Sequence, residues 1–234
     1  MKRTLLVASA FLFLVIFSQA QIRVACIGNS ITYGAGIKNR DSLSYPAQMG
    51  RILGEKWVVQ NFGISGATLL KKGDKPYWKQ PRLSDAMAFA PDVVVIKLGT
   101  NDSKPQNWKF KDEYVSDYLK LVDTLQAMPL HPVIFVCLPV PAYASKWGIS
   151  DSIINVDVIP MVKSVAKQRK LKVIDLNTVL QNHAELFPDK IHPNAEGAGL
   201  MAEKIASELT KSSKSIAKNI KVQSQKWTDL SIKE

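Results

Sequence analysis

The stretch IRVACIGNSITYGAG, residues 22–36, decides the fold and carries the first candidate functional group. Its mostly apolar, partly β-branched start predicts a buried strand, and Gly28, Asn29 and Ser30 then end that strand in a tight turn. Open α/β sheets bind their ligands in the crevice outside the carboxyl ends of the strands. Ser30 is therefore a candidate for such a crevice, although a serine after a strand is also a common N-cap of the next helix.

Four further apolar runs follow this strand, and helical patterns separate them. The runs that predict strands are 57–62, 92–98, 133–138 and 171–176, and the helical patterns cover 43–53, 82–89, 112–128, 151–170, with a kink or boundary at Pro160, and 195–209. Such alternation is typical of βαβ units with right-handed crossovers. The sequence thus predicts the α/β class, with a five-stranded parallel sheet covered on both faces.

Both ends of the chain differ from this domain, which we expect to span residues 21–210. Lys2 and Arg3, an apolar run and small residues before a cut after Ala20 predict a secretory signal peptide in residues 1–20, with an uncleaved anchor as the alternative. The apolar run is shorter than the about 20 residues of a membrane span, so we expect no stable membrane insertion after cleavage, and a secreted or periplasmic protein. Residues 211–234 form a basic tail without clear periodicity, predicted to be a peripheral helix or disordered.

The net charge of +11 at pH 7 raises the question of an acidic partner. Six of the lysines lie in the basic tail and the others are scattered, without an arginine-rich or aromatic-basic motif, so we expect no nucleic-acid partner. A solvated surface is the simplest interpretation, and an anionic glycan or cell envelope is the alternative. The oligomeric state is left open.

The cysteines and histidines give no sign of a metal site. Cys26 and Cys137 each lie within an apolar strand and are expected to be buried free thiols, although the sequence leaves a disulfide open. The three histidines lie in separate regions, so no metal-ligand spacing is present. The glycines after the first strand match neither a dinucleotide-binding nor a P-loop pattern.

Two more strands end in loops with groups suited to catalysis. Gly66 follows the second strand and Asn101 the third, while Asp189 lies three residues before His192, just ahead of the last helix of the domain. Taken singly, Gly66 would be interpreted as a turn glycine, Asn101 as a helix N-cap and Asp189 as a solvated acid. Because parallel strands end at one edge of the sheet, however, we expect all of them to meet Ser30 in one crevice.

These residue types together fit nucleophilic attack on a carbonyl group. A serine hydroxyl becomes a nucleophile when an imidazole accepts its proton, and a carboxylate on the other ring nitrogen fixes the tautomer. Ser30, His192 and Asp189 would be this triad. The N–H groups of Ser30 and Gly66 and the amide of Asn101 would bind the oxyanion that develops on the attacked carbonyl.

The pattern resembles the GDSL, or SGNH, hydrolase family, whose motif blocks match GNSIT around Ser30, NFGISGAT around Gly66, GTND around Asn101 and DKIHPN with Asp189 and His192. The resemblance extends over residues 22–209. It implies a three-layer α/β/α, flavodoxin-like fold, ester hydrolysis through an acyl-serine, and no metal or organic cofactor. One departure is Asn29, where the family usually has aspartate before the serine.

The function expected from these observations is that of a secreted esterase that removes short acyl groups, most of all acetyl, from carbohydrate. Export, the basic chain and the aromatic residues expected in loops, Trp147 among them, favour a polar, ring-shaped substrate over a lipid. A lysophospholipase or thioesterase of the same fold is the alternative enzyme. A catalytically silent glycan-binding module is the alternative outside the enzymes.

Overall fold

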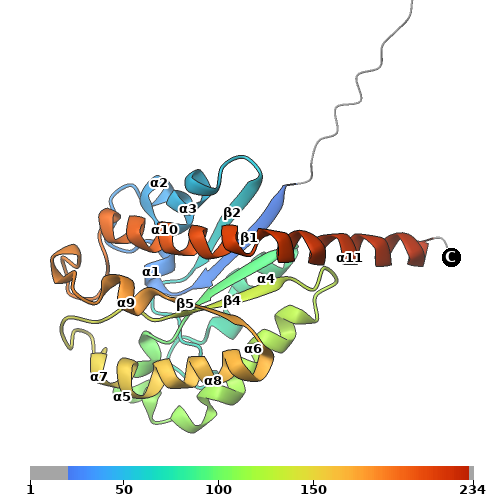
Figure 1. Cartoon of the computed structure of the whole chain (residues 1–234). Helices are drawn as coiled ribbons and strands as arrows, with labels where there is room; N and C mark the ends of the chain where they lie inside the picture. Colours follow the sequence, from blue (N-terminus) through green and yellow to red (C-terminus); the bar gives the residue numbers. More distant parts are fainter. Residues whose placement is uncertain (1–20, 232–234) are drawn as a thin grey trace, which may run out of the picture.

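Five parallel strands form the centre of the protein, whose computed structural model describes residues 21–231 (Figure 1). Their order across the sheet is β2-β1-β3-β4-β5. The strands are β1 Ile22–Gly28, β2 Trp57–Gly63, β3 Val93–Lys97, β4 Val133–Leu138 and β5 Lys172–Asp175. The five-stranded parallel sheet predicted from the sequence is therefore confirmed.

Helices cover both faces of this sheet. The α-helices are α1 Ser30–Tyr33, α2 Arg40–Leu43, α3 Tyr45–Leu53, α4 Pro81–Ala88, α5 Pro105–Trp108, α6 Tyr114–Gln126, α7 Asp151–Ile153, α8 Ile159–Arg169, α9 Leu176–Leu180, α10 Ala195–Lys211 and α11 Ser213–Ser231. Short 3₁₀ turns lie at Tyr77–Lys79, Asn101–Ser103, Lys111–Glu113 and Ala184–Leu186, and a π-helical turn lies at Ile154–Val158.

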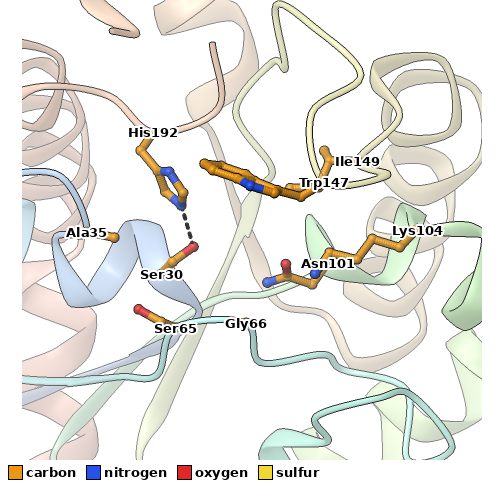
Figure 2. A pocket seen from close by; sticks show the side chains of 9 residues that line it. All are labelled: Ser30, Ala35, Ser65, Gly66, Asn101, Lys104, Trp147, Ile149 and His192. Atoms are coloured by element: carbon orange, nitrogen blue, oxygen red, sulfur yellow. Dashed lines mark hydrogen bonds between the residues drawn. The ribbon is translucent and has the colours of Figure 1, made fainter. Parts of the chain in front are cut away.

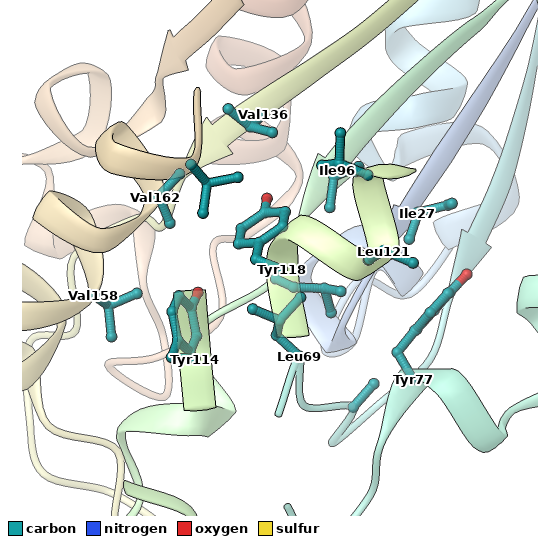
Figure 3. Close-up of a cluster of buried hydrophobic side chains, with 14 of the residues drawn as sticks. Ile27, Leu69, Tyr77, Ile96, Tyr114, Tyr118, Leu121, Val136, Val158 and Val162 are labelled. Atoms are coloured by element: carbon teal, nitrogen blue, oxygen red, sulfur yellow. The ribbon is translucent and has the colours of Figure 1, made fainter. Parts of the chain in front are cut away.

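The two faces of the sheet bury separate apolar clusters, as expected for three layers. Alternate residues of β1, β3 and β4 pack against α4, α6 and α8 on one face, where Tyr114 and Tyr118 lie among aliphatic side chains (Figure 3). The other residues of the same strands pack against α3, α9 and α10. Cys26 and Cys137 lie in this second cluster as buried free thiols.

Pro160 explains why the predicted helix over 151–170 is interrupted. Proline has no N–H to donate to the preceding turn. The turn before it widens into the π-helical segment Ile154–Val158, in which the N–H of Ile159 bonds to the carbonyl of Ile154. The regular helix α8 then begins at Ile159, with Pro160 in its first turn, where the missing donor is tolerated.

The basic tail continues as α11, which runs past the sheet in Figure 1. Its first half is anchored, since Ile216 is buried beside α10 and Ile220 packs against the same cluster. Within residues 21–231, no helix combines the length and apolar character needed to cross a bilayer. The predicted signal peptide, residues 1–20, lies outside the residues that the structure describes, and the domain boundaries stay predictions.

The pairing of the strands brings three loops to one edge. Gly28, at the end of β1, lies opposite Gly63 at the end of β2 and opposite Lys97 at the end of β3. Side chains that follow these three strands therefore emerge at the same level of the sheet, where open α/β folds bind ligands.

Candidate active site

Ser30 is the first residue of α1, directly after β1. The carbonyl oxygen of the Asn29 side chain accepts the N–H of Ile31 at 3.1 Å and so caps the helix. Gly63 of β2 lets α1 approach closely, because a Cβ there would lie 2.2 Å from the backbone nitrogen of Tyr33. Ser30 is 9% exposed, and its N–H, at the start of a helix, has no partner within that helix.

His192 lies within hydrogen-bonding distance of both Ser30 and Asp189, and Figure 2 shows its contact with Ser30. The Ser30 hydroxyl lies 2.8 Å from His192 Nε2, and His192 Nδ1 lies 2.7 Å from a carboxylate oxygen of Asp189. A hydroxyl that donates to an imidazole, which in turn donates to a carboxylate, has the arrangement of a nucleophile, base and orienting acid. The three residues predicted as a triad are thus within hydrogen-bonding distance.

The turn that carries His192 also determines the charge of Asp189. Partial burial acts to raise the pKa of Asp189, but bonds from the His192 backbone, the imidazole and the Ile191 backbone outweigh it and hold the pKa below its usual value. Asp189 therefore stays ionised at neutral pH. Asn194 caps α10 through the N–H of Gly197, and this fixes the chain immediately after His192.

Asn101 and Gly66 lie across the cavity from His192 (Figure 2). One N–H of the Asn101 amide donates to the carbonyl of Ala67 at 3.0 Å, which leaves its other N–H for a ligand. Gly66 has a φ of +81°, a left-handed conformation that favours glycine. Both predicted oxyanion residues thus line the cavity that holds Ser30.

Asp102 holds the loop of Gly66 in place. Its carboxylate accepts the N–H groups of Leu69 and Leu70 at 3.1 and 2.8 Å. Burial raises the pKa of Asp102 to about 6, although these backbone bonds act to lower it. The residue next to Asn101 thus ties the third loop to the second.

The cavity has a volume of about 270 Å³ and opens to solvent. Its walls near the base of α1 and the second loop carry only small groups, from Ala35, Ser65 and Gly66. On the opposite side, Trp147 is 55% exposed, and its ring centre lies 5.5 Å from that of His192. In Figure 2 the indole is seen nearly edge-on above the space between Ser30 and Asn101.

The loop that carries Trp147 is anchored at both ends. Tyr143 donates its N–H to the carbonyl of Lys190 at 2.8 Å, within the turn of the candidate base, and its hydroxyl to the carbonyl of Leu180. At the other end Ile149 is buried. Trp147 itself has a φ of +55°, which is uncommon for a large side chain, so this backbone fixes where the indole is presented.

The sequence interpretation did not single out two buried charged residues beside this site, Asp102 and Lys97. A lysine at the end of the apolar run VVVIK was the available signal, since an unpaired charge is rare in a buried strand. Among residues 21–231, no three histidine, cysteine or acidic side chains gather closely enough to hold a metal ion.

Comparison with known proteins links this geometry to a family. Residues 26–200 match the GDSL-like Lipase/Acylhydrolase family. An acetylxylan esterase of Xylanibacter ruminicola is 45% identical over 206 residues, which cover 80% of this chain and 43% of that protein. The chain spans less than half the length of the curated relatives it matches.

Solved structures agree in fold. Est24, a carbohydrate acetylesterase from Sinorhizobium meliloti, superposes with a TM-score of 0.69 at 19% identity, covering 82% of this chain and 99% of that one. An aryl esterase of M. smegmatis gives 0.68 at 18% identity, covering 81% and 99%. At these identities the likeness concerns the fold, and it agrees with the predicted three layers.

Proposed function

Because this chain belongs to the GDSL-like lipase/acylhydrolase family, we propose that it is a serine esterase that removes acetyl groups from carbohydrate. The observation that carries the proposal is the hydrogen-bonded chain from Ser30 through His192 to Asp189 at the wall of an open cavity. The similarity to an acetylxylan esterase supports an acetylated glycan as the substrate.

The reaction proceeds in two halves. In the first, His192 Nε2 takes the hydroxyl proton as Ser30 Oγ attacks the ester carbonyl, and the oxyanion accepts hydrogen bonds from the Ser30 and Gly66 N–H groups and from the Asn101 amide. His192 then gives the proton to the departing sugar oxygen, which leaves acetyl-Ser30. In the second half His192 activates water, and acetate departs as the serine is restored.

The position of His192 assigns the two sides of the cavity. The imidazole must reach the oxygen of the leaving alcohol in order to protonate it, so the alcohol lies on the imidazole side. Trp147 is the neighbour of His192 on that side, and its exposed indole offers a flat apolar surface for a sugar ring. The small side chains of Ala35 and Ser65 border the remaining space, which suits acetyl better than a long acyl chain.

Export of the protein is part of this proposal, since an enzyme that acts on an extracellular polysaccharide must leave the cytoplasm. It rests on the charged, apolar and small-residue pattern of residues 1–20. Fractionation of cells that produce the full chain tests it, with the processed protein expected outside the inner membrane.

Acetate release from an acetylated xylooligosaccharide and from ethyl acetate tests the proposed reaction, because these esters share the acyl group and differ in the alcohol. Wild-type protein should hydrolyse both, and Ser30→Ala should hydrolyse neither at a rate above about 10⁻³ of wild type. Val156→Ala, at a 69% exposed side chain outside the cavity, serves as the control for substitution. Equal turnover by Ser30→Ala and wild type would refute the nucleophile.

The role of Trp147 is tested with the same pair of esters. Trp147→Ala should lower kcat/KM on the oligosaccharide by about tenfold and on ethyl acetate much less, because only the sugar reaches the indole. Trp147→Phe should recover part of the loss. An equal loss on both esters would mean that the indole acts on His192 and not on the sugar. The acyl preference is tested separately with p-nitrophenyl esters, on which higher activity toward octanoyl than toward acetyl would refute the acetylesterase proposal.

A further inference from the structure

A buried amine lies between the two halves of the candidate site. Lys97, the last residue of β3, is fully buried, and its Nζ lies 2.9 Å from the hydroxyl of Thr100 and 3.4 Å from the side-chain oxygen of Asn29. No carboxylate in the described part of the chain pairs with it. The mechanism above does not use this group.

The two partners of Lys97 are the residues that precede the reacting groups. Asn29 comes immediately before Ser30, and Thr100 immediately before Asn101. The Asn29 oxygen accepts both the N–H of Ile31 and the amine, whereas the nitrogen of the same amide has no partner among the described residues. The Asn29 side chain is therefore oriented by its oxygen alone, and Lys97 supplies one of the two donors that orient it.

Stability does not explain a lysine at this position. Burial of an amine without a carboxylate costs free energy, and an apolar side chain of similar volume is often neutral or stabilising in its place. The face of β3 that carries Lys97 also carries Val93 and Val95, which pack in an apolar cluster. Residues that break such a packing rule are expected where function requires them.

We infer that Lys97 is a positioning residue, whose amine ties Asn29 to Thr100 and thereby sets the distance between the Ser30 hydroxyl and the Asn101 amide. The inference rests on the proposed function, because only an attack by Ser30 on an ester held by Asn101 makes that distance matter. Among the side-chain hydrogen bonds of residues 21–231, those of the amine are the only ones that link the turn of the nucleophile to the turn of the oxyanion asparagine. It acts on the reaction through its neighbours and does not touch the substrate.

The test replaces each end of this link while keeping its shape. Lys97→Met removes the amine, and Thr100→Val removes the hydroxyl that accepts from it. Each should lower kcat on ethyl acetate, by about tenfold for Lys97→Met, with KM within about twofold of wild type, because misplacement of about 1 Å costs up to 10² in rate. The double variant should be no slower than Lys97→Met alone, since one link is broken in both.

The melting temperature separates positioning from a structural role. Lys97→Met should melt at the temperature of wild type or higher, although it is slower. Ser212→Ala is the matched control, because it removes a buried hydroxyl that accepts from Lys172 at 2.6 Å at the opposite edge of the sheet. This variant should keep the wild-type kcat.

Three results would overturn the inference: an unchanged kcat in Lys97→Met, a joint loss of kcat and melting temperature, or additive losses in the double variant. If Lys97→Met yields no folded protein, Lys97 has a structural role and the inference fails. An unchanged kcat in Thr100→Val would likewise count against the link through Lys97. Absence of ester turnover in wild type would instead refute the proposed function itself.

Discussion

Replacing Lys97 with methionine should remove a pH dependence from the free energy of unfolding. Burial lowers the pKa of Lys97 from 10.5 to about 7, with a smaller opposing effect of Cys137. Between pH 7 and 10.5 the unfolded chain therefore binds more protons at this lysine than the folded chain, so stability rises with pH and is lost as pH falls. Integrated from pH 7 to pH 9, this amounts to about 2 kcal/mol.

Urea unfolding of wild type and Lys97→Met at pH 7, 8 and 9, under reducing conditions, measures this effect. The five tryptophans give a fluorescence signal. The stability of wild type relative to the variant should increase by about 2 kcal/mol over this range. Burial raises the pKa of the Cys137 thiol to about 12 and that of Tyr45 well above its usual value, so neither group titrates between pH 7 and 9 in the folded protein. Parallel pH curves for the two proteins would refute the reasoning.

Asn29→Asp offers an internal check on the same charge. A carboxylate oxygen 3.4 Å from the amine would attract it by about 5 kcal/mol at an effective dielectric of about 20. That attraction raises the pKa of Lys97, so the free energy of unfolding of Asn29→Asp should depend less on pH than that of wild type. In the Lys97→Met background the same carboxylate keeps the N–H of Ile31 but is buried without a cation, and should destabilise by about 3–5 kcal/mol. Equal effects of Asn29→Asp in both backgrounds would contradict the proximity of the two groups.

Further variants examine the rest of the site and its support. Asn101→Ala should lower kcat by about 10²–10³ through loss of one oxyanion donor, and a loss below threefold would exclude that role. Asp189→Asn should lower kcat by about 10⁴, because the imidazole then loses its working tautomer; an unchanged pH–rate profile at full activity would contradict this. Gly63→Ala should lower the free energy of unfolding in urea by about 3 kcal/mol, since the added Cβ would lie 2.2 Å from the Tyr33 nitrogen. Its control is Gly50→Ala in the helix α3, where the added Cβ would lie 3.5 Å from the nearest atom. This variant should raise the free energy of unfolding by about 0.5–1 kcal/mol.

The sequence was most informative where local patterns determine the structure. Apolar β-branched runs predicted all five strands, most clearly the central strands β1, β3 and β4, because a parallel strand buried on both faces has little choice of composition. The fifth strand ends at Asp175, one residue before its predicted end, because the Asp175 side chain caps α9 through the N–H of Thr178. The pairing of Asp189 with His192 was predictable because the two residues lie three positions apart in a tight turn.

Contacts between distant segments were beyond reach of the same patterns. The contact of the Lys97 amine with Asn29 joins residues 68 positions apart, and the bonds from Leu69 and Leu70 to Asp102 join two separate loops. Neither is visible in the periodicity of a single segment. The residue types gave a hint, but the partners are a property of the folded chain.

The spacing of the candidate triad along the chain has a consequence for how the protein acquires activity. The contact of His192 with Asp189 closes a loop of three residues, whereas its contact with Ser30 joins residues 162 positions apart. Short loops close at low entropic cost and early, and distant ones only once the intervening chain is in place. The imidazole and its acid thus form a unit that local structure can assemble by itself. During refolding, the return of ester turnover would report the last step, when the first and final segments of the domain come together.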